Sequence, residues 1–284
     1  MENLLSLSFD YLSSFDGVKI RKGLRQLEGL LAQICLSRTT TAAERRRSTA
    51  IDGVAKSSPK DLASLSEDPA FREFFKLQEG FEWNVAIRLI SCLERLLGKG
   101  SNGQNDLLLV STLDLLRGVL LIHPPSRSLF AREIYMNLLL DLLEPSSCPA
   151  VQSSAVLTLV TALLEQPSIT RCFESLDGLL TVTSLFKNRG TSREVKLKLV
   201  EFLYFYLMPE IPYAGRDAAN AHGGPHRSPS KASRLGSGGR ERPEGAEGTK
   251  TTNEKQSLLG RYLNNVEDLV EDLKETAPFG TNFG

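Results

Sequence analysis

The residue types that carry enzyme chemistry are few in this 284-residue chain, and they are scattered. Of the three histidines, His123 precedes two prolines, and His222 and His226 lie in a glycine-rich stretch. None has a second ligand-type residue at the spacing of a metal site. The chain also contains no GxSxG, P-loop, kinase or HExxH motif. Because catalysis needs a converging nucleophile, base or metal, we predict a non-enzymatic protein with no metal and no cofactor.

The cysteines and the charge balance indicate the compartment and the class of partner. The four cysteines lie far apart, in or beside apolar stretches, where a free thiol acts as a small hydrophobe and suits a reducing compartment. The 34 basic and 34 acidic residues balance, so no general attraction to nucleic acid or an anionic membrane is expected. No apolar run approaches the ~20 residues of a membrane span, and the N-terminus lacks the basic residues of a secretion signal. We expect a soluble cytoplasmic protein without membrane insertion.

Three serines have the flanking residues of kinase substrates. Ser48 follows three arginines, as basophilic kinases prefer, and Ser228 lies in the S-P-x-K layout of cell-cycle proline-directed kinases. Ser58, which precedes a proline, is a weaker version. A phosphate would add a charge of about −1.5 to −2 and could alter how neighbouring segments dock. As a nucleic-acid patch, the arginine run is too short and lacks interleaved aromatic residues.

The elements that must position any site are helices. Apolar residues recur at helical spacing, and proline and glycine separate the helical stretches. No segment shows the two-residue alternation of a strand bounded by tight turns, so we predict an all-α chain. The helical stretches are 3–36, 61–79, 82–97, 106–122, 127–143, 149–165, 168–174, 175–187 and 192–207.

An internal repeat relates the helices from residue 106 onward. Breakers, bulky aromatic residues and leucines recur at an offset of 43 residues, or 44 with one insertion. The matched pairs are Pro124/Pro167, Phe130/Phe173, Leu142/Leu185 and Leu120/Leu163 at 43, and Val151/Val195 at 44. A period in the range of about 40–47 residues with two or three helices is typical of armadillo and HEAT repeats. We therefore predict an armadillo/HEAT-like right-handed helical solenoid with disordered insertions, and an irregular helical bundle is the alternative.

Composition divides the chain into five parts. We expect N-terminal helices at 1–37, a flexible loop at 38–60, the helical-repeat domain at 61–210, a disordered linker at 211–256 and an amphipathic helix with a tail at 257–284. The last helix has apolar residues at alternating four- and three-residue spacing. Because it spans fewer than three heptads, we favour packing onto its own solenoid. An obligate homo-oligomer through this helix is the alternative.

Exposed cations and one tyrosine of the later repeats are our predicted partner-binding residues, because helical-repeat proteins offer long concave surfaces to a partner. Tyrosine combines rigid apolar area with a polar tip, which suits a binding surface, but packing against the neighbouring repeat is the role we favour for the aromatic residues of this helix. The predicted set is Lys187, Arg189, Arg193, Lys196, Lys198 and Tyr204.

Three stretches, HPPSRSLFAREIYMNLLLDLLEP, SREVKLKLVEFLYFYLMPE and VEDLVEDLKETAPFG, resemble the fungal cell-division-control scaffold family of the septation initiation network. The resemblance covers most of the chain outside the two flexible parts and brings no catalytic residues. It implies a protein at the spindle pole body that binds and activates a sterile-twenty-type kinase of the germinal-centre class during septum formation and cytokinesis. We expect a monomer or a heterodimer with the kinase. The alternative is a spindle-pole adaptor that anchors partners without changing kinase activity.

Overall fold

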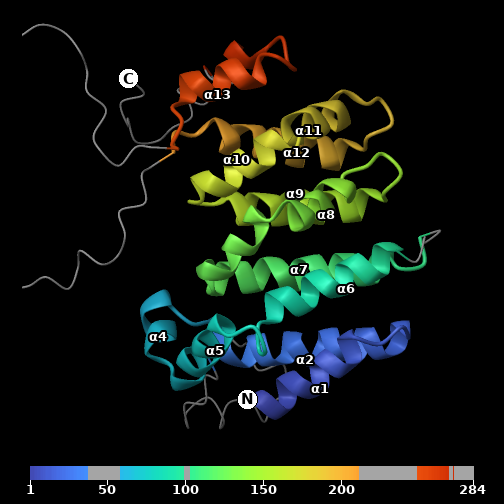
Figure 1. Ribbon diagram of the computed structural model, residues 1–284, viewed down its shortest axis with the longest axis vertical. Coiled ribbons are helices and arrows are strands. Elements are labelled where there is room, and N and C mark those ends of the chain that lie inside the picture. Colours follow the sequence, from blue (N-terminus) through green and yellow to red (C-terminus); the bar gives the residue numbers. More distant parts are fainter. Residues whose placement is uncertain (38–57, 99–102, 211–247, 269–270, 272–284) are drawn as a thin grey trace, which may run out of the picture.

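The computed structural model describes residues 1–37, 58–98, 103–210, 248–268 and 271, and these residues are almost entirely helical (Figure 1). His222, His226, Ser48 and Ser228 lie outside them. The helices are α1 (Glu2–Leu12), α2 (Gly17–Cys35), α4 (Leu62–Glu67), α5 (Pro69–Glu79), α6 (Val85–Gly98), α7 (Asp106–Ile122), the 3-10 helix η1 (Pro124–Ala131), α8 (Glu133–Asp141), α9 (Pro149–Leu163), α10 (Pro167–Ser175), α11 (Gly178–Lys187), α12 (Arg193–Leu207) and α13 (Thr252–Leu259).

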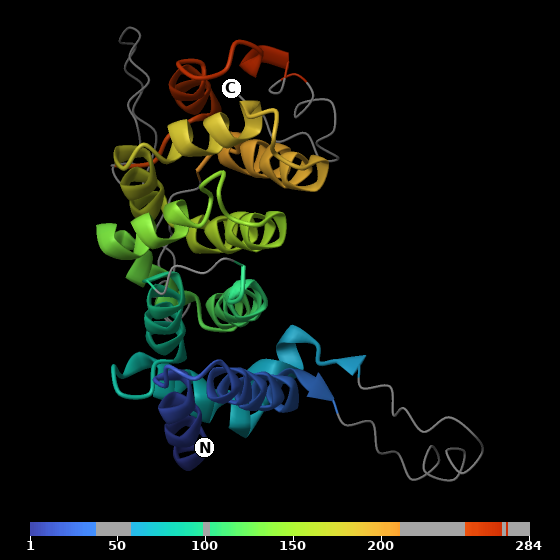
Figure 2. The same cartoon turned by 90° about the vertical axis from the view of Figure 1, so that its right-hand side faces the viewer.

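The helices lie in layers stacked along the long axis of the molecule (Figure 1). From the N-terminal end, the layers contain α1 with α2, α6 with α7, α8 with α9, and α10 and α11 with α12, and α13 lies on the last layer. The helices α2, α7, α9 and α12 pack one on the next and form a column on one side of the stack. The helices α1, α6, α8, α10 and α11 form the other side (Figure 2). We call the first set the long-helix column.

The 43-residue spacing relates residues with the same local structure. Pro124 and Pro167 each occupy the first turn of a short helix, where the missing N–H is not needed. The residues before them have nearly identical backbone angles, with φ −129° and ψ 77° at His123 and φ −128° and ψ 78° at Gln166. At this offset η1 corresponds to α10, and α7 corresponds to α9.

A buried arginine joins two of these equivalent helix ends. The Arg127 side chain, which is only 5% exposed, donates from Nε to the carbonyl of Leu120 at 3.1 Å and from Nη1 to the carbonyl of Leu164 at 3.0 Å. These carbonyls lie at the C-terminal ends of α7 and α9, where backbone acceptors lack partners within the helix and a positive charge is favourable. One side chain thus satisfies the ends of two successive helices of the long-helix column.

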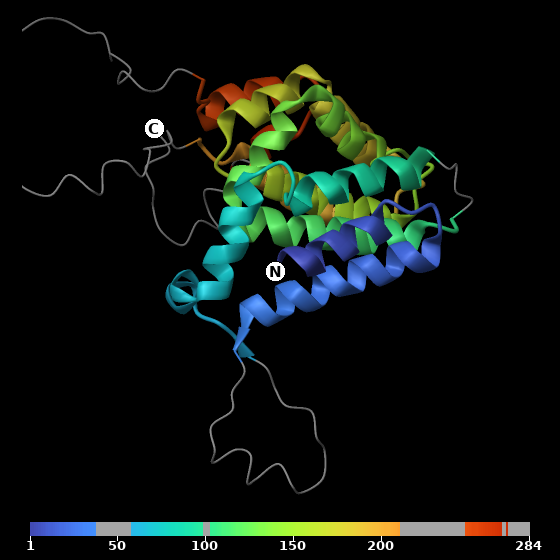
Figure 3. The same ribbon diagram turned by 60° about the horizontal axis from the view of Figure 1, so that its bottom comes forward.

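A short strand pair is an exception to the helical fold. The strands β1 (Leu36–Ser37) and β2 (Ser58–Pro59) pair antiparallel, and the Lys60 N–H donates to the carbonyl of Cys35 at 2.9 Å. The sequence predicted no strand here, because two residues are too few to show alternation. The pair lies at the C-terminal end of α2, with α4 and α5 on the same side of the stack (Figure 3). Ser58 is therefore in β2 rather than in a free loop.

The predicted helix at 127–143 is wrong, because the chain breaks at Arg132. That residue has an extended backbone, with φ −84° and ψ 125°, and it separates η1 from α8. Two prolines open η1, and the Ser128 hydroxyl donates to the carbonyl of Pro125 at 2.7 Å. Serine hydroxyls that bond to nearby backbone compete with the α-helical ladder, and proline supplies no donor to it.

The C-terminal helix also differs from the prediction, because α13 begins at Thr252 inside the expected linker at 211–256 and ends at Leu259. A capping box sets its start. The Glu254 N–H donates to the Thr251 hydroxyl at 3.3 Å, and the Thr251 N–H donates to the Glu254 carboxylate at 2.8 Å. Beyond α13, Leu263 and Val266 are also buried.

Two glycines test the packing of the layers. A Cβ on Gly178, at the start of α11, would lie 2.2 Å from the Phe173 ring and 2.6 Å from its carbonyl oxygen, whereas a Cβ on Gly118 of α7 would meet open space. We expect Gly178→Ala to destabilise the protein by about 1–3 kcal/mol through overpacking. Gly118→Ala should stabilise it by roughly 0.5–1 kcal/mol through helix propensity. Urea unfolding measures both, and equal effects would contradict the packing of α10 against α11.

Candidate functional site

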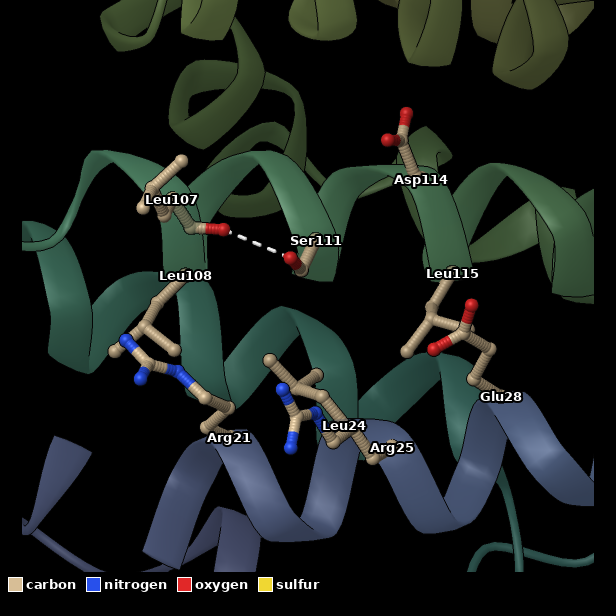
Figure 4. A pocket seen from close by; sticks show the side chains of 9 residues that line it. All are labelled: Arg21, Leu24, Arg25, Glu28, Leu107, Leu108, Ser111, Asp114 and Leu115. Atoms are coloured by element: carbon tan, nitrogen blue, oxygen red, sulfur yellow. Dashed lines mark hydrogen bonds between the residues drawn. The ribbon is translucent and has the colours of Figure 1, made fainter. Parts of the chain in front are cut away.

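A groove of about 630 Å³ lies between α2 and α7 at the N-terminal end of the long-helix column. Its walls combine apolar and charged side chains (Figure 4). The lining residues are Arg21, Leu24, Arg25, Glu28, Leu107, Leu108, Ser111, Asp114 and Leu115. We call it the α2–α7 groove.

The pattern of α2 explains why charged residues face this groove. Asp16 caps the helix by accepting from the Val18 N–H at 2.9 Å, and the apolar residues then recur at helical spacing and are buried in the stack. Arg21 and Arg25 fall between these buried positions and are exposed. On the other wall, the exposed face of α7 presents Leu107, whose side chain is 75% exposed, and Ser111.

One end of the groove carries positive charges and the other end carries negative charges. At one end, Arg21 reaches from α2 toward Leu108 of α7, and Arg25 lies along α2 beside Leu24. Glu28 lies beside Leu115 at the other end (Figure 4). Neither guanidinium group forms an ion pair or hydrogen bond with any residue that the structure describes. Like charges four residues apart disfavour a helix by roughly 0.2–0.5 kcal/mol. The two arginines therefore give this helix no stabilising ion pair in the free protein.

A second hollow continues along α2 on the far side of the same arginines. It has a volume of about 490 Å³, and Val18, Arg21, Lys22, Arg25 and Gln26 line it. The Val18 side chain is 73% exposed, so both hollows have an exposed apolar side chain beside the two arginines. A patch that combines exposed apolar area with unpaired charge is typical of an interaction surface rather than of a catalytic cleft.

The partner-binding residues predicted from the sequence lie elsewhere, on α11, on α12 and in the loop between them, in the last full layer (Figure 1). Lys187 donates to the carbonyl of Tyr262, and Lys198 pairs with Glu201 at 2.8 Å. On α12, Arg193, Lys196 and Tyr204 share one side at helical spacing, and Lys198 lies on another. Arg189 is exposed in the loop. The set spans several faces, and its role stays a prediction.

A buried polar cluster fixes the C-terminal segment onto the last layer. The Lys255 ammonium group, whose side chain is 5% exposed, lies 3.1 Å from the Glu210 carboxylate and donates to the carbonyl of Met208 at 2.9 Å. Burial lowers the pKa of Lys255, and the Glu210 carboxylate opposes that shift. Nearby, the Tyr206 hydroxyl donates to Glu174 at 2.7 Å. Burial, reinforced by that carboxylate, raises the pKa of this tyrosine. The cluster joins α10, α12 and α13, so its chemistry is structural.

His123 is buried rather than available as a ligand or base. Its Nδ1 lies 2.8 Å from the Ser126 hydroxyl, and its ring meets the Phe75 ring edge-on at 4.5 Å between centroids. Burial lowers the pKa of His123 to about 4, so the side chain is neutral at pH 7. Across the described ranges, no group of three or more His, Cys, Asp or Glu side chains is placed to hold a metal ion.

The cysteine thiols are buried or partly buried and poorly reactive. All four cysteines are free, and burial raises the pKa of each thiol, which lowers its reactivity at neutral pH.

In the part of the chain that the structure describes, no single helix is long and apolar enough to cross a membrane. The helices α7 and η1 pass that test only as a pair, and the chain bends by 117° between them.

Comparisons with known proteins agree with the resemblance seen in the sequence. The family described as "Cell division control protein 14, SIN component", where SIN denotes the septation initiation network, matches residues 1–279. A relative, the cell division control protein 14 of Schizosaccharomyces pombe (strain 972), is 30% identical over 289 residues, which cover 99% of this chain and 97% of that protein. No solved structure matches the chain. The family resemblance predicted from the sequence is confirmed.

The buried histidine predicts a pH dependence of stability. Because folding holds the pKa of His123 near 4, below its ordinary value of 6.5, the unfolded chain binds the proton first as the pH falls. This group therefore costs no stability above about pH 7, and it removes up to about 3 kcal/mol as the pH falls from 6.5 to 4. Gln166, 43 residues later, has nearly the same backbone angles, so His123→Gln should fold and lose less stability on acidification. Equal pH profiles in urea unfolding would contradict this.

The polar cluster predicts how α13 is held. Glu210→Gln removes the carboxylate from the buried Lys255, and breaking a buried pair is strongly destabilising. We expect amide hydrogens of α13 to exchange at least tenfold faster while those of α7 are unchanged. Glu201→Gln, which breaks the more exposed Lys198–Glu201 pair, is the matched control and should leave the exchange of α13 unchanged. Unaltered exchange of α13 in Glu210→Gln would show that the cluster does not hold it.

Proposed function

The chain belongs to the family of cell division control protein 14, SIN component, and we propose that it is a non-catalytic scaffold that binds and activates a protein kinase of the septation initiation network. Membership of the family gives it a role in septation. The kinase class we propose is the sterile-twenty type of the germinal-centre group, with the complex located at the spindle pole body.

The observation that carries this proposal is the stacked architecture with the exposed α2–α7 groove. We propose that the layers form an armadillo-type solenoid, in which each repeat contains a short helix, a second helix and a long helix. The equivalence of Pro124 and Pro167, each at the start of a short helix, supports this assignment. In such a solenoid, the long helices form a continuous surface suited to a protein partner.

The proposed mechanism is a shift in the kinase's conformational equilibrium. A partner that binds only the active conformation shifts the population by its differential affinity for the two states. Moving a kinase from 1% to 99% active requires a difference of about 10⁴ in affinity. A rigid scaffold suits this role because little conformational freedom is lost on binding. The chain itself supplies no catalytic group to the reaction in this account.

A direct assay separates the activator from the adaptor. We expect purified chain, added to a purified sterile-twenty-type kinase of the network, to co-elute with it in size-exclusion chromatography and to raise its phosphorylation rate at least tenfold. The control is the same kinase with its active-site lysine replaced, which should bind the chain but remain inactive. Co-elution with an unchanged rate would overturn the activator and favour an adaptor that only anchors the kinase at the spindle pole.

A further inference from the structure

We propose that the α2–α7 groove binds an amphipathic helix of the partner protein, with carboxylates on the turn that lies over Arg21 and Arg25. The inference deepens the proposed function, because it assigns the chemistry of the partner segment and the place where it docks. It rests on the groove, on its charges and on its exposed apolar side chains.

The charge of the groove selects an acidic segment. Arg21 and Arg25 are one helical turn apart, and neither is paired with an acid among the residues that the structure describes. Both line the α2–α7 groove and the adjoining hollow, so a ligand in either space meets both guanidinium groups. A guanidinium group donates two parallel hydrogen bonds to a carboxylate, and two such groups one turn apart match two carboxylates on one face of a helix.

The apolar part of the groove selects a helix with a leucine-like face. Leu24 and Leu108 are buried in its floor, Leu115 is half-buried at the far end, and Leu107 on the rim is three-quarters exposed. A space of about 630 Å³ accommodates a few side chains rather than a folded domain. Helix-in-groove recognition has this form, with anchors at three- and four-residue spacing laid between two helices.

The far end of the groove sets the orientation of the bound helix. Glu28 and Asp114 line that end, and Asp114 already pairs with Arg117 at 3.3 Å. Carboxylates of a partner helix would be repelled there and attracted at the Arg21 end. The graded charge therefore disfavours the reversed helix, and discrimination of this kind needs a repulsive element as well as an attractive one.

A nucleic acid fits the groove less well than a protein helix. The lining contains two arginines against two acidic residues and, among the described residues, no aromatic side chain on which a base would stack. Single-stranded nucleic acids bind through positively charged grooves that carry aromatic platforms. The mixed charge is equally unsuited to an anionic membrane surface.

The test uses the full chain and two synthetic 16-residue helical peptides. Both carry leucines at the same three- and four-residue spacing, and glutamates flank the leucines at one end of the first peptide, where the second has lysines. We expect fluorescence anisotropy to show binding of the glutamate peptide and at least tenfold weaker binding of the lysine peptide. Equal binding of both, or tighter binding of single-stranded RNA or anionic vesicles than of the glutamate peptide, would overturn the inference.

Matched variants locate the binding. Arg21→Ala/Arg25→Ala should lower the affinity for the glutamate peptide at least tenfold. The control, Lys19→Ala/Lys76→Ala, removes two exposed lysines outside the groove and should leave the affinity unchanged. Circular dichroism confirms that both double variants fold. An unchanged affinity in the arginine variant would overturn the inference.

The apolar contact is tested in the same assay. Leu107→Ala should lower the affinity for the glutamate peptide severalfold. Its control is Ile134→Ala, which truncates an exposed side chain on α8, far along the stack from the groove, and should leave the affinity unchanged. Equal affinities for the two variants would contradict docking against the α7 rim.

The kinase assay keeps this inference separate from the proposed function. If the arginine variant activates the kinase like the wild type and neither form binds the glutamate peptide, the groove assignment fails and the activator proposal stands. If the peptide binds as expected and the wild type leaves the kinase rate unchanged, the docking site stands and the activator proposal fails.

Discussion

Each helix pair in this chain has an apolar face that only the next layer covers, and the rest of the structure depends on that stacking. The clearest case is α9, at the centre of the long-helix column, which packs against both α7 and α12 and is buried along most of its length. Two of its threonines are satisfied within the helix. The hydroxyls of Thr158 and Thr161 donate to carbonyls one turn back, at 2.8 and 2.9 Å. A layer without neighbours would expose this surface, so the stacking of layers supplies the core.

The same stacking explains where the chain accommodates its long insertions. After α7 and after α9, the joint to the next short helix is at most a few residues, and a proline opens that helix. After α2 and after α12, the joint opens into the long segments 38–57 and 211–247. Each opening is closed at its base, by β1 and β2 in the first case and by Glu210 and Lys250 in the second, where the Lys250 N–H donates to the Glu210 carboxylate at 2.8 Å. The insertions therefore interrupt the sequence without interrupting the stack.

Apolar periodicity, together with helix-breaking proline and glycine, was enough to predict most of the helices. The surface that the packed layers form could not be predicted in this way. The helix at 106–122 was predicted with its observed bounds, because apolar spacing and His123-Pro124 define it locally. The break at Arg132 was missed because no glycine or proline marks it. The start of α13 was missed although Thr251 and Glu254 form a capping-box signature in the sequence.

The α2–α7 groove could not be predicted from the sequence, for a physical reason. Which face of α2 meets α7 depends on how two layers pack, and nothing local to either helix specifies it. The available signal was the pair of like charges, Arg21 and Arg25, four residues apart on α2. The prediction instead favoured the cations of α11 and α12, two of which are engaged by Tyr262 and Glu201 within the chain.

The central claim is that the chain acts by holding a kinase against the long-helix column at its N-terminal end. Hydrogen–deuterium exchange of the full chain, with and without the purified kinase, tests it most directly. The account predicts slower exchange on complex formation in Gly17–Cys35 and Asp106–Ile122, with Arg193–Leu207 unchanged. Protection confined to Arg193–Leu207, or no protection in either groove helix, would contradict it.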